Sequence, residues 1–400
     1  MTIGTTPVTS KRRHAGVLVA LGALSAFGPL SMDLYLPALP DLGRDLGVGD
    51  ASAQLTMSLC MVGLALGQLV AGPLSDRTGR RPVLLTGVAV YMVTSLLCAF
   101  APGIWPLILL RFAQGFAGGA GMVISRAMVR DLFDGQRAVR VFSTLMMVSG
   151  LAPVLAPLLG GQLARVTSWR GMFVVLAVIG LLLLLAAFAL PETLPPRDRQ
   201  EGGLRETAVQ FTVLGRDRQF VGYTLVLALM SCALFIYISL SPFVLQNEYE
   251  MSAQLFSVIF AVNSLGIVLV GRLNSVGTRR LSPRTLLGAG IGVGLTGAAI
   301  SLAAVLSGWG LPVLLPALFL VVSSLGVIMP NATALALEPH GRRAGSASAF
   351  LGTGQFLLGA VVPPLISGDG ATAITLTVGI VVVGALALVV HAGTRGPTRA

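Results

Sequence analysis

Twelve long apolar segments follow one another along this chain of 400 residues. A helix needs about 20 apolar residues to cross the hydrocarbon core of a bilayer, and each segment meets that length. Charged residues make up only 11% of the chain, against about 25% in an average globular domain. The sequence therefore predicts an all-α integral membrane protein with twelve transmembrane helices. The segments cover residues 15–38, 52–73, 82–101, 105–127, 139–163, 170–190, 219–242, 252–272, 283–306, 311–336, 343–366 and 371–393.

Basic residues lie on one side of these segments. If the N-terminus and every second loop are cytoplasmic, all but four of the 27 basic residues fall in cytoplasmic regions. Cytoplasmic loops of membrane proteins carry an excess of Lys and Arg. The net charge of +11 is therefore explained by these loops, and we expect no nucleic-acid partner. We expect a multi-pass protein of the bacterial inner (cell) membrane with both termini in the cytoplasm.

The segments form two sets of six. A proline-rich linker with alternating charges, residues 191–218, separates a first half at 15–190 from a second half at 219–393. Short tails at 1–14 and 394–400 complete the chain. The tetrapeptide Ser-Ala-Gln-Leu opens the second segment of each half, at 52–55 and 252–255. Two parallel six-helix halves with a site between them are typical of transporters.

The loop after the second segment has an ordered pattern, GPLSDRTGRRP, over residues 72–82. Its arginines are suited to anchoring a cytoplasmic face, and its acid is suited to a helix N-terminus. An ordinary positive-inside turn is the alternative. The second half has only a degenerate counterpart at 271–280, GRLNSVGTRR, which lacks the acid. The residues that define the pattern are Gly72, Asp76, Arg77, Gly79, Arg80 and Arg81.

Once the charges at the segment ends are assigned to the loops, two charged residues remain deep within the apolar segments, Asp33 in the first and Arg111 in the fourth. Asp33 lies seven residues, or about 10 Å at 1.5 Å per residue, from the outer end near Pro40, and Arg111 lies at a similar depth, so the two can share a cavity. The proton affinity of a buried carboxylate responds to hydration and to a nearby arginine, which is a physical basis for proton coupling. The alternatives are a structural pair and an arginine that binds backbone carbonyls. After Arg111, Gly115 and Gly119 predict a close-packing helix face.

The fifth segment contains Pro153, Pro157, Gly160 and Gly161 within GLAPVLAPLLGG. The prolines predict a bent helix and the glycines predict tight contact with a neighbour. A plain packing helix is the alternative.

Together, MDLYLPALP, GPLSDRTGRRPVLL, LRFAQG, APLLGG, PET after the sixth segment and PNATALAL near 330–337 resemble one family. They are similar to the twelve-span drug:proton antiporters of the major facilitator superfamily, in the group associated with bicyclomycin and chloramphenicol resistance. The resemblance covers nearly the whole chain. It implies that Asp33 is the protonation site and Arg111 its partner, and that the fifth segment carries the antiporter motif of exporters. It also implies that Asp76 and Arg80 hold a cytoplasmic gate, with Asp131 as ion partner.

We expect the substrate between the halves near mid-membrane, against Met32, Leu145, Ser149 and Phe235 and away from the gate residues. Neutral or weakly cationic amphipathic drugs suit so apolar a lining. The sequence predicts no metal, no cofactor, no enzymatic activity and a monomer in contact with membrane lipid. Alternative functions are the proton-coupled export of a metabolite, such as a sugar or an amino acid, and uncoupled transport.

Overall fold

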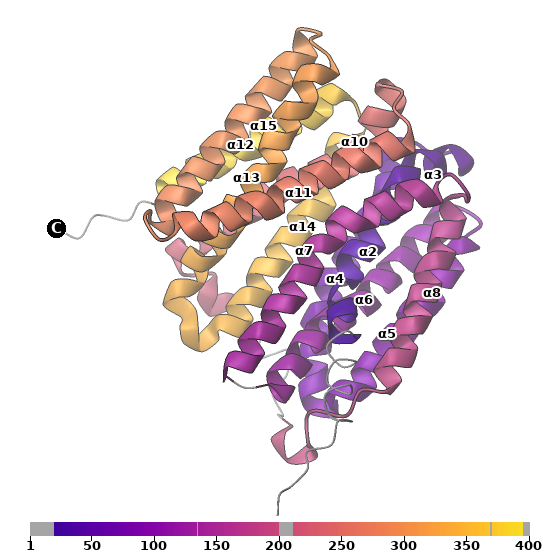
Figure 1. Cartoon of the computed structure of the whole chain (residues 1–400), viewed down its shortest axis with the longest axis vertical. Helices are drawn as coiled ribbons and strands as arrows, with labels where there is room; N and C mark the ends of the chain where they lie inside the picture. Colours follow the sequence, from indigo (N-terminus) through magenta and orange to yellow (C-terminus); the bar gives the residue numbers. More distant parts are fainter. Residues whose placement is uncertain (1–19, 134, 200–210, 369, 395–400) are drawn as a thin grey trace, which may run out of the picture.

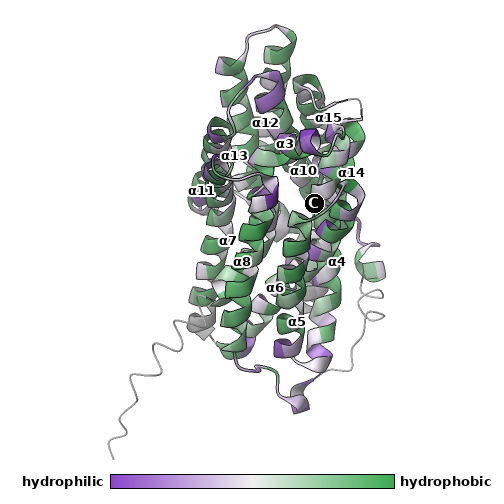
Figure 2. Ribbon diagram, turned by 90° about the vertical axis from the view of Figure 1, so that its right-hand side faces the viewer, coloured by the Kyte–Doolittle hydropathy of each residue, from purple (hydrophilic) through white to green (hydrophobic). Residues whose placement is uncertain are grey.

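The computed structural model describes residues 20–133, 135–199, 211–368 and 370–394, and this part of the chain forms helices and no strands. Ten helices are long and apolar enough to cross a membrane. Helices satisfy their own backbone hydrogen bonds, which the interior of a bilayer requires. The ten are α4 (Asp50–Thr78), α5 (Arg80–Ala99), α6 (Ile104–Leu132), α8 (Trp169–Phe188), α10 (Arg218–Phe243, extended by η3, Val244–Glu248), α11 (Ala253–Gly277), α12 (Pro283–Leu306), α13 (Leu311–Leu337), α14 (Ala344–Ile366) and α15 (Ala373–Gly393). Figure 2 shows these long helices coloured mostly as hydrophobic.

Two further expected spans are less regular. Helix α7 (Gly135–Leu163) is 29 residues long and contains two prolines. The first segment is broken into α2 (Phe27–Asp33), η1 (Leu36–Ala38) and α3 (Leu39–Asp45), where the sequence predicts one continuous span to residue 38. Pro37 and Pro40 open η1 and α3, and proline cannot donate the backbone hydrogen bond that a continuous helix needs. The chain therefore bends directly after Asp33.

The helices form two groups, α2 to α8 and α10 to α15, which are the first and second halves of the predicted fold (Figure 1). The all-helical, two-half fold is confirmed, while the exact limits given for the halves stay a prediction. In the first half, α4 and α6 pack closely through glycines, as the spacing after Arg111 predicts. A Cβ on Gly115 would lie 2.0 Å from the carbonyl oxygen of Cys60, and one on Gly67 equally close to that of Phe116. Small residues allow such backbone contact in a membrane.

The two ends of the bundle differ in charge and in how the halves meet. We call the end that carries Arg80 and Arg279 the basic end, and the end that carries Asp50 and Glu248 the acidic end. Near the acidic end, hydrogen bonds between described residues join the halves. They link Ala371 N to the Asp50 carboxylate (3.0 Å), Ser367 Oγ to Gln54 Oε1 (3.0 Å) and Gln254 Nε2 to Gly161 O (3.0 Å). At the basic end a cavity separates α4 and α6 from α14. The halves are thus closed at the acidic end and apart at the basic end.

Candidate functional site

Arg80, the central residue of the 72–82 loop, is buried and fully paired. Its guanidinium lies 2.6 Å from Asp76 and 3.0 Å from Asp131, and it donates to the hydroxyl of Ser75 at 2.7 Å. Only 3% of Arg80 is exposed. A buried charge is stable only when it is paired and hydrogen-bonded, and these three contacts provide that. The three residues that the family resemblance assigns to a gate therefore form one ion cluster, whereas Arg77 is exposed.

Glu192 holds the turn between α4 and α5 from outside that cluster. Its carboxylate accepts the backbone N–H groups of Arg80 (2.9 Å) and Arg81 (3.1 Å) at the start of α5, and those of Thr193 and Leu194. Burial alone would raise the pKa of Glu192, but the four N–H donors outweigh it and lower the pKa. The side chain of Arg81 donates to the carbonyl of Phe188 at the end of α8. Glu192 thus joins the turn to the sixth span.

Gly79 makes this turn possible. Its φ of 105° is in the region that favours glycine, and a Cβ there would lie 2.6 Å from the Glu192 carboxylate. In the sequence, Glu192 belongs to the PET segment that resembles the family, and no role is predicted for it. The sequence does contain a signal for this role. Glu192 is an acid that directly follows a span, and the first N–H groups of a neighbouring helix have no acceptor within that helix.

Arg111 is fully buried inside the first half. Its Nε donates to the carbonyl of Thr56 at 3.3 Å, and a second nitrogen donates to the side chain of Gln114. The guanidinium carbon lies 4.5 Å from the ring centre of Tyr35 and 5.4 Å from that of Phe173. These contacts satisfy most of the charge by hydrogen bonds and by cation–π attraction. Arg111 makes no ion pair with Asp33.

Asp33 is 5% exposed and ends α2 at the break in the first span. Within the described part of the chain, its carboxylate has no hydrogen bond or ion pair. Tyr35, two residues further on, lies against Arg111 and bonds the hydroxyl of Thr56 at 3.0 Å. The two intramembrane charges are therefore connected through the broken segment, and no direct pair links them.

The glycines of the fifth segment lie where α7 meets two neighbours. A Cβ on Gly160 would lie 2.0 Å from the carbonyl oxygen of Leu34, directly after Asp33. A Cβ on Gly161 would lie 2.3 Å from the hydroxyl of Ser257 in α11. Pro153 and Pro157 lie inside α7, about two turns and one turn before these contacts. This end of α7 therefore contacts both the break beside Asp33 and the second half.

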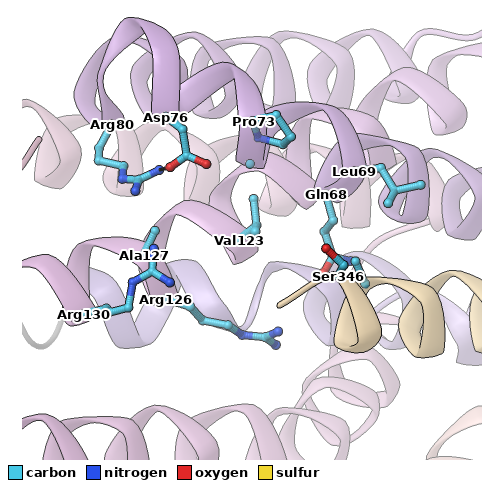
Figure 3. Close-up of a pocket in the computed structure, with 12 residues that line it drawn as sticks. Gln68, Leu69, Pro73, Asp76, Arg80, Val123, Arg126, Ala127, Arg130 and Ser346 are labelled. Carbon is cyan, nitrogen blue, oxygen red and sulfur yellow. Dashed lines mark ion pairs between the residues drawn. The ribbon is translucent and has the colours of Figure 1, made fainter. Parts of the chain in front are cut away.

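A cavity of about 440 Å³ opens at the basic end between α4, α6 and α14. Gly72, Asp76 and Arg80 line this cavity, and Figure 3 labels the last two. The gate residues therefore border the cavity, whereas the sequence predicts a substrate cavity at a distance from them. A deeper part of about 180 Å³ reaches Phe356. The ring of Phe356 lies 6.0 Å from that of Phe235, and both Phe235 and Met61 lie against Gly359.

Of the residues expected to contact the substrate, one lies beside this cavity and two lie in the packed core. Phe235 is half-buried beside the cavity. Met32 and Leu145 are buried, and both belong to a packed core that includes residues of both halves. The side chain of Ser149 lies outside the described residues. Among the described residues, no group of three or more His, Cys, Asp or Glu side chains is placed to hold a metal ion.

Arg126 lies near the end of the fourth apolar segment, and the charge pattern counts it among the cytoplasmic arginines and predicts no site role for it. Arg126 lies inside α6, six residues before the last residue of that helix, which is about 9 Å at 1.5 Å per residue. It lines both parts of the cavity together with Gln68. The available signal was its place within the apolar run that follows Arg111.

Comparison with known proteins agrees with this geometry. The model of the Major Facilitator Superfamily matches residues 20–363. The chain is 37% identical over 375 residues to an uncharacterized MFS-type transporter, YdgK, of Bacillus subtilis, with 92% of each chain covered. It is 32% identical over 371 residues to a bicyclomycin resistance protein homolog of Haemophilus influenzae, covering 92% of this chain and 93% of that one.

A solved structure has the same fold. It is the crystal structure of a bacterial homolog to the human lysosomal transporter Spinster in an inward-facing and unoccupied conformation, with a TM-score of 0.76 and 16% identity. The alignment covers 98% of this chain and 97% of that one. The helical architecture, the two halves and the family match over most of the sequence lead to one conclusion: this chain is a multi-pass membrane transporter that belongs to the major facilitator superfamily.

Proposed function

We propose that this transporter exports small amphipathic drugs, such as bicyclomycin- or chloramphenicol-type antibiotics, in exchange for protons. It acts as a monomer in the bacterial inner membrane, with the basic end and both termini in the cytoplasm. The excess of arginine at the basic end supports this orientation. The similarity to a bicyclomycin resistance protein homolog supports the substrate class.

The observation that carries the proposal is the Asp33 carboxylate at the break between α2 and η1, which has no partner among the described residues. A charged carboxylate without a partner is costly in a low-dielectric interior, so Asp33 binds a proton while it is enclosed and loses the proton when water or a drug reaches it. Gly160 of α7 packs directly against the next residue, Leu34, and the neighbouring Gly161 packs against the second half. A rocking motion of the halves therefore changes the surroundings of Asp33.

The test uses everted membrane vesicles in which respiration makes the interior acidic. We expect the wild-type protein to accumulate labelled chloramphenicol in the vesicles and to lose this accumulation when a protonophore collapses the whole proton gradient. A protonophore is needed because exchange of a neutral drug for a proton moves charge and is therefore also driven by the membrane potential. Asp33→Asn cannot release a proton and should not accumulate the drug. Asp41→Asn, which changes an exposed carboxylate on α3, is the matched control and should behave as wild type. Accumulation that persists with the protonophore, or in Asp33→Asn, would contradict the proposal.

A further inference from the structure

The cavity at the basic end has an excess of positive charge. Its wider part is lined by three arginines, Arg80, Arg126 and Arg130, and by one acid, Asp76. Arg80 is already neutralised, because it pairs with Asp76 and Asp131. Arg130 is exposed at the mouth. Arg126 is therefore the cation that lies within the cavity, between the two halves.

Arg126 has no partner in the described part of the chain. It makes no hydrogen bond or ion pair there, and its Nε is buried without an acceptor. In Figure 3 its side chain extends from α6, away from Arg130, toward the side of the cavity where Gln68 and Ser346 lie. An N–H donor removed from water without an acceptor is unfavourable, and a carboxylate or similar oxygen group can accept from two donors of a guanidinium at once.

The two parts of the cavity differ in the charge of their lining. The deeper part is lined by Arg126, by uncharged polar side chains such as Gln68 and Thr353, and by Phe356, whose ring contacts Phe235. A ligand that fits this lining has an anionic or oxygen-rich head that reaches Arg126 and an aromatic tail that reaches Phe356.

We propose that Arg126 is a specificity-determining residue that binds an anionic or strongly hydrogen-bond-accepting head group of the exported compound, while Phe356 and Phe235 contact its aromatic tail. This inference rests on the proposed export function and narrows its substrates. It favours amphipathic compounds with a carboxylate, sulfonate or nitro group over amphipathic cations, which Arg126 repels.

The test compares two fluorescent probes that share one ring system. The first is 8-anilinonaphthalene-1-sulfonate, which carries an anionic head, and the second is N-phenyl-1-naphthylamine, which lacks it. Binding of both is titrated to the full-length protein in phosphatidylcholine nanodiscs. Arg126→Gln should weaken binding of the sulfonate about tenfold, as expected for a lost charge-assisted hydrogen bond, and leave the affinity for the neutral probe unchanged. Arg126→Lys should restore most of the sulfonate affinity, and the exposed Arg77→Gln should have no effect.

A second variant tests the same site without removing the arginine. Ala349 of α14 lines both parts of the cavity with Arg126, so Ala349→Glu places a competing carboxylate on the opposite half. It should also weaken the sulfonate selectively. Equal weakening of both probes by Arg126→Gln, or no change for the sulfonate, would overturn the proposal.

Two further arms distinguish recognition of a transported compound from lipid binding and from proton coupling. Phosphatidylglycerol added to the nanodiscs should not change the sulfonate affinity of the wild type. Competition by this lipid that disappears in Arg126→Gln would assign the residue to lipid head groups and overturn the proposal. The probe titration is done at equilibrium without a proton gradient, so its result does not depend on whether the transporter exchanges protons. If Arg126 proves not to bind the sulfonate, the vesicle assay with Asp33→Asn still tests proton coupling independently.

Discussion

The loop between α4 and α5 and its counterpart between α11 and α12 occupy equivalent places in the two halves but are held by different chemistry. In the first half, Arg80 pairs with Asp76 and Asp131. In the second half, Asn331 of α13 donates to the side chain of Asn274 of α11 at 2.7 Å, and Arg279 is exposed. Charged groups tie α4 to α6, whereas a neutral amide pair ties α11 to α13.

This difference shows what the charged loop adds. Both arrangements hold two helix ends together, so helix packing alone does not require charge. The charged cluster borders the cavity mouth and connects through Glu192 to the segment after α8, whereas the amide pair is buried between two helices of its own half. We infer that the first-half loop responds to opening and closing of the basic end, and that the second-half loop holds its helices in one arrangement.

The largest expected effect is from Arg80→Ala. It leaves Asp131, which is mostly buried, without its cation, and breaking a buried pair in this way costs about 3–5 kcal/mol. We expect a lower midpoint of thermal unfolding in detergent and a loss of chloramphenicol transport. Arg77→Ala removes an exposed arginine from the same loop and serves as control. Equal behaviour of the two variants would remove the distinction between the halves.

A smaller effect is expected from Glu192→Gln, which replaces one acceptor oxygen by a donor that faces backbone N–H groups. The carboxylate is exposed, so we expect a loss of about 1 kcal/mol, as for an N-terminal cap. Because folding lowers its pKa, Glu192 stabilises the fold above the unfolded value of about 4.3, and this contribution is lost as the pH falls below it. Thermal unfolding from neutral pH to about pH 3 should show this loss in the wild type and less of it in the variant. Identical acid profiles would show that Glu192 does not hold the turn.

The smallest effect is expected in the second half. Replacing both amides, Asn274→Leu with Asn331→Leu, leaves no unpaired polar partner, and such double replacements are close to neutral, within about 1 kcal/mol. Thermal stability and transport should both stay near wild type. A loss of transport as large as that of Arg80→Ala would mean that the amide pair has a gating role, and the comparison would fail.

Much of the fold could be predicted from local patterns. Apolar segments predicted the helices, and Gly115 and Gly119 predicted a close-packing face, which is the contact of α6 with α4. Both predictions succeeded because each depends only on the residues of one short stretch of sequence. The break after Asp33 is also local in origin, since Pro37 and Pro40 cause it. Its consequence, that Tyr35 rather than Asp33 contacts Arg111, depends on where three helices place their side chains.

The candidate site could be predicted only in part for the same reason. The pattern of the 72–82 loop included Asp76 and Arg80, and the family resemblance implied Asp131 as their ion partner. Glu192 reaches that loop from a segment more than 100 residues away in sequence. Charge counting placed Arg126 in a loop because it lies near the end of its span. Only the packing of α14 against α4 and α6 shows that this arginine faces the second half across a cavity.

The central claim is that one carboxylate, Asp33, exchanges its proton for a drug. The most direct measurement adds chloramphenicol to the purified protein in weakly buffered detergent solution and follows a pH indicator. We predict that the wild type and the exposed-site control Asp41→Asn release protons as the drug binds, and that Asp33→Asn binds the drug without releasing any. Proton release by Asp33→Asn equal to that of the wild type would contradict the account.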